Sequence, residues 1–289
     1  MALPFGMQGV DLDLGDTAAA EKERRLRAWL AERGTVAIGY SGGVDSAYLA
    51  AVAVDELGAD RVLAIIGRSA SYPDSQWSVA REVAATIGLQ ILEIDTDELN
   101  DPRYAANPTN RCYFCKTELW SRVVPAARER GIDVVADGTN AEDLLGHRPG
   151  AQAAREHGVV SPLALCDFSK AEIRERSRAI GLPTWQQPSS PCLSSRIPYG
   201  TPVTVGRLKR VERAEAALRD LGITGDLRVR HFGSLARVEL GPVELHHWSA
   251  DDRRSALAEA VRGAGYDEVE LDAKGFRSGA LNVATVPRD

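Results

Sequence analysis

The sequence predicts an α/β protein in which a parallel sheet with helices on both faces is followed by a smaller α+β region. Two observations predict this fold. Short, apolar, β-branched runs alternate with helical segments over most of the chain, which is typical of a parallel sheet. Beyond Pro202 the pattern changes to a long amphipathic helix, two alternating strands, a charged helix and a further strand. This change indicates a second domain.

The first part begins with a charged helix over residues 18–33, closed by Gly34. Strands are then expected at 35–38, 61–66, 89–94 and 132–136, and helices at 47–57, 74–87, 116–130 and 170–181. In the second part we expect helices at 205–221 and 251–263 and strands at 226–232, 234–240 and 267–271. The expected domain limits are a tail over 1–17, a larger domain over 18–195 and a smaller one over 196–289. Ligands should gather at the carboxyl ends of the parallel strands.

Composition sets broad limits on function. Of the 289 residues, 44% are hydrophobic and 26% are charged, as in ordinary soluble globular proteins, and no apolar run approaches the length of a membrane span. The net charge of −6 argues against a large nucleic-acid footprint, which normally appears as a basic excess. The acidic N-terminus lacks the positive start and apolar centre of a signal peptide. We therefore expect a cytoplasmic protein that binds neither membranes nor nucleic acid.

The most informative stretch is a glycine turn, residues 39–46, between a predicted strand and a predicted helix. Gly42 and Gly43 let the backbone approach an anion, and the first helical turn points its N–H groups at it. Ser41 and Ser46 add hydroxyl donors, and Asp45 adds a carboxylate suited to a metal that bridges phosphates. We therefore expect these five residues to bind the pyrophosphate part of a nucleotide. A tight βα turn without a ligand is the alternative.

Two further segments follow the ends of predicted strands. Ser69 lies just past one end and is a candidate for lining a nucleotide pocket, although a simple turn before Pro73 explains it equally well. Gly138 lies past another end, within the stretch Asp137-Gly138-Thr139-Asn140-Ala141-Glu142-Asp143. The carboxylates and the amide of this stretch suit ATP or magnesium, but Asp, Asn and Gly are also ordinary turn formers.

Four cysteines in a reducing compartment are better explained as metal or catalytic thiols than as a disulfide framework. Cys112 and Cys115 have the spacing that lets two thiolates face one metal, and Cys192 lies in a Pro- and Ser-rich stretch further on. Three thiols suit an iron–sulfur cluster with one iron left without a protein ligand. A zinc site and a dithiol redox pair remain open. Cys166 is expected to pack as a small hydrophobe.

The segment of Cys192 also carries hydroxyls, among them Ser195, and the guanidinium of Arg196. A guanidinium beside the thiol would favour the thiolate, which is the nucleophilic form. Arg228 and Arg230 alternate along a predicted strand, so both point to one face, where paired guanidinium groups suit a phosphate. A solvated strand face is the alternative, and without further information it is favoured.

These segments together resemble the LarE family of ATP-dependent sulfur transferases, which contribute to building the nickel-pincer nucleotide cofactor of lactate racemase. Residues 41–46 resemble the PP-loop of the ATP pyrophosphatases. The likeness extends over nearly the full length, and the Cys192 segment is its most specific part. It rests on residues 41–46, 111–116, 137–140, 148–150, 192–200 and 275–279.

The resemblance implies a PP-loop (adenine nucleotide alpha hydrolase-like) fold that uses ATP and Mg²⁺. It implies that ATP adenylates a carboxylate of pyridinium-3,5-dicarboxylic acid mononucleotide, and that sulfur then displaces AMP to give a thiocarboxylate. Arg228 and Arg230 match positions suited to the substrate phosphate, and Cys192, Ser195 and Arg196 would be catalytic. A homo-oligomer, for instance a hexamer, is also implied.

The resemblance leaves the source of sulfur open. Some family members sacrifice one cysteine, at a position where this chain has Pro191. Here Cys112, Cys115 and Cys192 match the three-cysteine subgroup thought to hold a [4Fe-4S] cluster, so we favour a cluster that carries an extra sulfide. Sacrifice of Cys192, a PP-loop tRNA thiolase and a non-catalytic nucleotide or cluster carrier are the alternatives.

Overall fold

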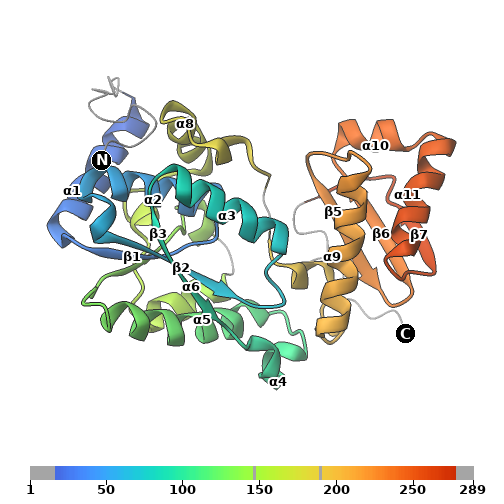
Figure 1. Ribbon diagram of the computed structural model, residues 1–289, viewed down its shortest axis with the longest axis horizontal. Coiled ribbons are helices and arrows are strands. Elements are labelled where there is room, and N and C mark those ends of the chain that lie inside the picture. The colour runs from blue at the N-terminus through green and yellow to red at the C-terminus, as the bar shows by residue number, and fades with distance from the viewer. Residues whose placement is uncertain (1–16, 146–147, 189–190, 278–289) are drawn as a thin grey trace. The chain divides into compact units, whose positions relative to one another are not determined.

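Figure 1 shows the computed structural model of the chain, which describes residues 17–145, 148–188 and 191–277. These residues form two compact units. The first comprises the described parts of Met1–Ser69, Asp74–Asp97 and Cys112–Gln187, and the second comprises Ala70–Pro73, Glu98–Arg111 and the described part of Pro188–Asp289. The predicted domain limits stay a prediction, and nearly all of the predicted tail over 1–17 lies outside the described residues.

The first unit is built on a parallel sheet of four strands in the order β3-β2-β1-β4. These strands are β1 (Val36–Gly39), β2 (Val62–Arg68), β3 (Gln90–Asp95) and β4 (Val135–Asp137). The chain moves outward from β1 to β2 and β3, then returns to the other side of β1 for β4. The carboxyl ends of β1 and β4 therefore flank the point where the strand order reverses, which is where open α/β sheets bind ligands.

Helices cover both faces of this sheet, as Figure 1 shows for the first unit. On one face α1 (Ala18–Arg33), α2 (Val44–Leu57) and α8 (Lys170–Ala179) contact one another, and α2 lies against β1 and β2. On the other face Trp120 and Ala127 of α5 (Arg111–Arg128) share a core with Ala37 and Ile65 of the sheet and with α6 (Pro149–Glu156). The α/β fold with a parallel sheet covered on both sides is thus confirmed. The unit also contains α3 (Asp74–Thr86), α7 (Pro162–Leu165), η1 (Ala59–Arg61), η3 (Glu142–Leu144) and η4 (Pro183–Gln186).

A buried ionic network ties three helices of this face together. Glu23 of α1 is fully buried, accepts a hydrogen bond from the Tyr48 hydroxyl of α2 at 2.8 Å, and pairs with Arg176 of α8 at 2.8 Å. Arg27 of α1 donates to the other oxygen of Glu23 at 2.9 Å. Because each partner satisfies the buried carboxylate, the pKa of Glu23 stays below its usual value despite the opposing effect of burial.

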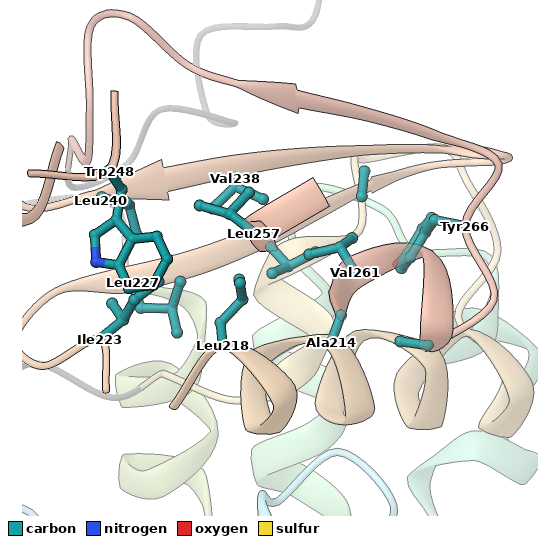
Figure 2. Packing of buried hydrophobic residues seen from close by; sticks show 13 residues of the cluster. Ala214, Leu218, Ile223, Leu227, Val238, Leu240, Trp248, Leu257, Val261 and Tyr266 are labelled. Atoms are coloured by element: carbon teal, nitrogen blue, oxygen red, sulfur yellow. The ribbon is translucent and has the colours of Figure 1, made fainter. Parts of the chain in front are cut away.

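The second unit contains a small mixed sheet of three strands in the order β5-β6-β7. In it, β5 (Leu227–Phe232) and β6 (Leu235–Leu240) are antiparallel, and β7 (Glu268–Leu271) is parallel to β6. Helices α9 (Val205–Asp220), α10 (Pro242–Trp248) and α11 (Asp251–Gly263) pack against it through the cluster drawn in Figure 2, which includes Leu218, Val238, Trp248, Leu257 and Val261. The unit also holds η2 (Glu98–Asn100), α4 (Pro102–Ala105) and η5 (Leu193–Arg196).

Two differences from the sequence prediction concern helix starts. Helix α5 begins at Arg111 and not at residue 116, so that the C-x2-C pair lies on its first turn instead of before the helix. Helices α4, α6, α7 and α10 fall in segments where no helix was predicted. Each of these four carries a proline in its first turn, where the missing N–H would have no helical partner anyway. Proline at such a position is compatible with a helix start.

No described helix has both the length and the apolar character needed to span a membrane.

Candidate functional site

The PP-loop of the first unit connects β1 to α2. Hydrogen bonds of Ser41 and Ser46 within the loop hold its shape. The Ser46 hydroxyl lies 3.2 Å from the Ser41 hydroxyl, accepts from the Ser41 backbone N–H at 3.2 Å and donates to the Gly43 carbonyl at 3.2 Å. Gly43 is the N-cap of α2 and makes no side-chain capping hydrogen bond. A phosphate oxygen is the natural acceptor for the N–H groups at such a helix start.

Two glycines allow close backbone approach at this site. Gly42 has φ +67°, and a Cβ there would lie 2.5 Å from Ala80 of α3. Gly138 follows β4, and a Cβ there would lie 2.8 Å from the Ser46 backbone nitrogen. The turns that leave β1 and β4 are therefore in direct contact at the point of strand-order reversal, and neither glycine can be replaced without moving backbone.

Asp45 is held by groups from two other elements. The Lys170 ammonium at the start of α8 forms an ion pair with one of its carboxylate oxygens, and the Asn140 side-chain amide donates to the other at 3.3 Å. Lys170 also donates its backbone N–H to Glu142 at 2.8 Å. The half-buried Asp45 thus lies between a cation and an amide at the carboxyl ends of β1 and β4.

The acidic stretch after β4 divides into turn-forming and site-facing groups. Asp137 accepts from the Thr139 N–H at 3.1 Å, from the Thr139 hydroxyl at 2.9 Å and from the Ser161 hydroxyl at 2.7 Å, so it closes its own turn. Asn140 reaches the PP-loop. Ser69 lies half-buried just past β2, the strand next to β1, and its predicted contact with a nucleotide stays a prediction.

Cys112, Cys115, Cys166 and Cys192 are all thiols. Cys112 is exposed and Cys115 half-buried on the first turn of α5, and residues three apart on a helix lie on the same side. Cys166 is buried, as predicted, and burial raises the pKa of its thiol. Cys192 is half-buried and belongs to the second unit. Within the described ranges, no group of three or more His, Cys, Asp or Glu side chains is arranged to hold a metal ion.

The second unit contains a buried arginine cluster, which we define as Arg196, Arg228 and Arg230. Each of the three is less than 6% exposed. Arg196 pairs with Glu215 of α9 through two bonds of 2.8 and 2.9 Å, and Arg230 pairs with Glu239 of β6 at 2.8 Å. The alternative that Arg228 and Arg230 form a solvated strand face is therefore wrong.

Arg228 is buried within the electrostatic reach of the other two arginines, Arg196 and Arg230, and of the carboxylates of Glu215 and Asp226. Burial, and then the neighbouring guanidinium of Arg196, lower the pKa of Arg228 to about 10. Its guanidinium lies over the Phe276 ring, 5.0 Å from the centroid, and donates to the Leu227 carbonyl at 2.6 Å. An anion placed here would relieve the mutual repulsion of buried guanidinium groups.

The arginine cluster is bonded to the backbone around Cys192. Arg196 donates to the carbonyls of Pro191 at 2.6 Å and Cys192 at 3.2 Å, and Arg230 donates to the carbonyl of Ser195 at 3.0 Å. These contacts go to the backbone, and the expected roles of Arg196 beside the thiol and of Ser195 in catalysis stay predictions. Residues 278 and 279 of the family-like C-terminal stretch lie outside the described residues.

Sequence reasoning missed several residues of these two sites. Lys170 and Gln76, whose amide donates to the Ser41 carbonyl at 3.0 Å, lie far from the PP-loop in sequence. Glu239, a buried carboxylate, pairs with Arg230 and was also missed. Glu215, which pairs with Arg196, is only half-buried. One signal was present for Lys170. It follows Ser169 and precedes Glu172, a capping-box pattern that marks a helix start, where a lysine is electrostatically disfavoured unless it has a partner.

The comparisons with known proteins agree with this geometry. A family model described as NAD synthase matches residues 20–123. An uncharacterized protein of Synechocystis sp., slr1717, is 44% identical over 90% of this chain and 97% of its own length. The pyridinium-3,5-bisthiocarboxylic acid mononucleotide synthase of Lactiplantibacillus plantarum is 33% identical over 91% of this chain and 94% of its own length. An NH(3)-dependent NAD(+) synthetase of Halobacterium salinarum is 33% identical over 63% of this chain and 71% of its own length.

A parallel sheet with a serine-glycine turn at its switch point and a carboxylate held beside that turn defines an ATP-using enzyme of the PP-loop class. The similarity to the L. plantarum synthase, which covers nearly the full length of both proteins, identifies the family within this class. It belongs to the LarE family, that of the L. plantarum pyridinium-3,5-bisthiocarboxylic acid mononucleotide synthase.

Proposed function

We propose that the protein is an ATP-dependent sulfur transferase that converts the carboxylates of pyridinium-3,5-dicarboxylic acid mononucleotide to thiocarboxylates in nickel-pincer nucleotide synthesis. The observation that carries the proposal is the arginine cluster, which binds the backbone on either side of Cys192. A buried positive site of this kind suits the phosphate of a mononucleotide. The name of the L. plantarum relative, a synthase of pyridinium-3,5-bisthiocarboxylic acid mononucleotide, supports a thiocarboxylate mononucleotide as the product.

The first step assigned to the PP-loop unit is adenylation. A substrate carboxylate oxygen attacks the α-phosphorus of ATP, the bond to pyrophosphate breaks, and an acyl-adenylate forms. The N–H groups at the start of α2 and the hydroxyls of Ser41 and Ser46 would hold the departing pyrophosphate. Lys170, which now neutralises Asp45, would supply positive charge to the phosphates.

Magnesium fits this site through oxygen ligands. The Asp45 carboxylate at the switch point is the chemical type that Mg²⁺ prefers, and bound Mg²⁺ would neutralise charge on the phosphates of ATP. Lys170 would then be released from Asp45 toward the nucleotide.

In the second step a sulfur nucleophile attacks the acyl carbon, AMP leaves with the bonding electron pair, and a thiocarboxylate remains. Adenylation is needed because a bare carboxylate is a poor electrophile. If Cys192 itself is the donor, its Sγ forms a thioester with the substrate. Loss of the Cys192 α-proton and cleavage of its Cβ–Sγ bond then release the thiocarboxylate and leave dehydroalanine.

We favour Cys112, Cys115 and Cys192 as ligands of a [4Fe-4S] cluster. Two of the thiols fit this role, because they lie on one side of the first turn of α5 and are accessible. The third belongs to the second unit. A cluster with three protein ligands would supply an open iron position at which an external sulfide binds.

The test combines metal content with turnover. The protein is purified without oxygen, and iron, acid-labile sulfide and substrate-dependent pyrophosphate release are measured for the wild type and for Cys112→Ala, Cys115→Ala and Cys192→Ala, with Cys166→Ala as the control cysteine. We expect about four irons per chain, lost in the first three variants and kept in the fourth.

Other outcomes of these measurements would support one of the alternative functions. Pyrophosphate release without iron, together with a loss of one sulfur from Cys192 per turnover in the protein mass, would support a sacrificed cysteine. Absence of substrate-dependent pyrophosphate release from the wild type would overturn the proposed enzyme. A salt-sensitive shift of tRNA in a gel would point to a tRNA thiolase instead.

A further inference from the structure

The segment of residues 104–107, which we call the anchor segment, binds the loop that carries Cys192. The loop, residues 191–203, and the anchor segment both belong to the second unit. The Tyr104 hydroxyl lies 2.6 Å from the Ser194 hydroxyl, and the Ala105 carbonyl accepts from the Val203 N–H at 2.8 Å. The anchor segment therefore contacts the loop near both of its ends.

Asn107 makes most of the contacts with this loop. Its side-chain amide donates to the carbonyls of Pro198 and Thr201 at 2.8 Å each and to the carbonyl of Ile197 at 3.3 Å. Its own carbonyl accepts from the Gly200 N–H at 3.0 Å. One residue thus binds four positions of the loop, five to nine residues beyond Cys192.

The conformation and burial of Asn107 indicate that this arrangement is specific. Asn107 is fully buried and has φ +58°, a left-handed conformation that asparagine tolerates better than most residues. Its side-chain oxygen accepts a hydrogen bond from Arg111, whose guanidinium also lies over the Tyr199 ring, 5.5 Å from its centroid. Both ends of the buried amide are therefore satisfied.

The start of the loop is fixed separately. The Leu193 N–H donates to the Ser71 carbonyl at 2.8 Å, and Arg196 holds the carbonyls of Pro191 and Cys192. Cys192 is the N-cap of η5 and lies between these contacts and those of Asn107. Cys192 is half-buried, and its backbone is held from both sides.

We propose that Asn107 is a positioning residue for sulfur transfer, which fixes the Cys192 loop through the carbonyls of Ile197, Pro198 and Thr201. This inference rests on the proposed function. Because the contacts of Asn107 lie in the loop and not in the PP-loop unit, its loss should impair the sulfur step and spare adenylation.

Asn107→Asp is the sharpest variant. Aspartate has the same shape, tolerates the same backbone conformation and retains the contact with Arg111, but it cannot donate to three carbonyls and instead presents oxygen to them. Asp167→Asn is the matched control, because Asp167 also has a positive φ of +61° and its side chain is 75% exposed. Tyr104→Phe, which removes only the hydroxyl bond to Ser194, provides a milder variant if Asn107→Asp fails to fold.

Three readouts test the inference. They are substrate-dependent pyrophosphate release, thiocarboxylate formation by mass spectrometry, and the rate at which iodoacetamide alkylates Cys192 relative to Cys112 and Cys115. For Asn107→Asp we expect pyrophosphate release within about twofold of wild type, thiocarboxylate formation reduced about tenfold or more, and a Cys192 alkylation rate changed at least about threefold. We expect the same pattern, smaller in size, for Tyr104→Phe, and no change for Asp167→Asn.

Wild-type thiocarboxylate formation and an unchanged Cys192 alkylation rate in Asn107→Asp would overturn the inference. Equal loss of pyrophosphate release and thiocarboxylate formation in Asn107→Asp and Tyr104→Phe would also overturn it. Asn107 would then support the fold as a whole and not the sulfur step. The alkylation comparison does not depend on turnover. A wild type that releases no pyrophosphate would therefore refute the proposed function while leaving the positioning of Cys192 separately measurable.

Discussion

Lys170 carries its positive charge at the first residue of α8, where the helix dipole disfavours a cation. Its ion pair with Asp45 offsets that cost and keeps the lysine at the PP-loop. We predict that Lys170→Met lowers substrate-dependent pyrophosphate release about 100-fold, as expected for removal of a group that stabilises developing charge. Lys209→Met, an exposed lysine on α9, is the control. Activity of Lys170→Met within about twofold of wild type would contradict the assigned role.

His231 is a buried titratable group on β5, and its Nδ1 lies 3.1 Å from the Tyr266 hydroxyl. Burial, and then Arg207 and Arg210, lower the pKa of His231 below its ordinary value of 6.5. Between 6.5 and this lower pKa the unfolded chain takes up a proton that the folded protein resists, so stability falls as the pH falls through that window.

We therefore predict that His231→Gln loses less stability than wild type between about pH 7.5 and about pH 5.5, measured as the change in urea midpoint. His246→Gln, an exposed histidine on α10, should lose as much as wild type. Parallel losses in His231→Gln and wild type would show that His231 does not contribute to acid sensitivity.

Helices α1, α2 and α8 meet at Glu23, and this junction is predicted to dominate their mutual stability. Glu23→Gln would leave the buried Arg176 without its counter-charge. We expect a loss of about 3–5 kcal/mol in the free energy of unfolding, measured by urea denaturation. Glu21→Gln on the same helix breaks only an exposed ion pair with Arg24 and should cost less than about 1 kcal/mol. Similar losses for the two variants would refute the prediction.

Strand β5 divides its side chains between two faces. Leu227 and Val229 enter the core of the second unit, and Arg228 and Arg230 alternate with them. We predict that Arg228→Gln raises the KM for the mononucleotide about tenfold or more while the KM for ATP is unchanged. Arg237→Gln on β6, where the side chain is 37% exposed and paired with Glu270, is the matched control. A change confined to the KM for ATP would remove Arg228 from the substrate site.

For the molecule as a whole, local patterns in the sequence predict the sheet, most of its helices and the PP-loop. Strand composition and a glycine turn are local features, and so is the apolar face that buries Leu26 and Leu30 of α1. The partners of the PP-loop residues are distant in the sequence. Asp45 pairs with Lys170, 125 residues further along the chain, and the Gln76 amide donates to the Ser41 carbonyl from 35 residues away. Arg230 and Glu239 are only nine residues apart, on the paired strands β5 and β6, but alternation along a strand does not tell which carboxylate an arginine meets. The four unpredicted helices α4, α6, α7 and α10 have four to eight residues, too few for helical periodicity to show, and their first-turn prolines do not mark a helix by themselves, because proline also ends helices.

The second unit is assembled from three separated stretches of chain, Ala70–Pro73, Glu98–Arg111 and the described part of Pro188–Asp289. During synthesis the first two emerge from the ribosome long before the third. Until then Tyr104 and Asn107, both buried in the finished protein, have no loop to bind. The second unit therefore cannot be completed before the last third of the chain has been made. For the same reason it cannot be transferred to another protein as one continuous segment.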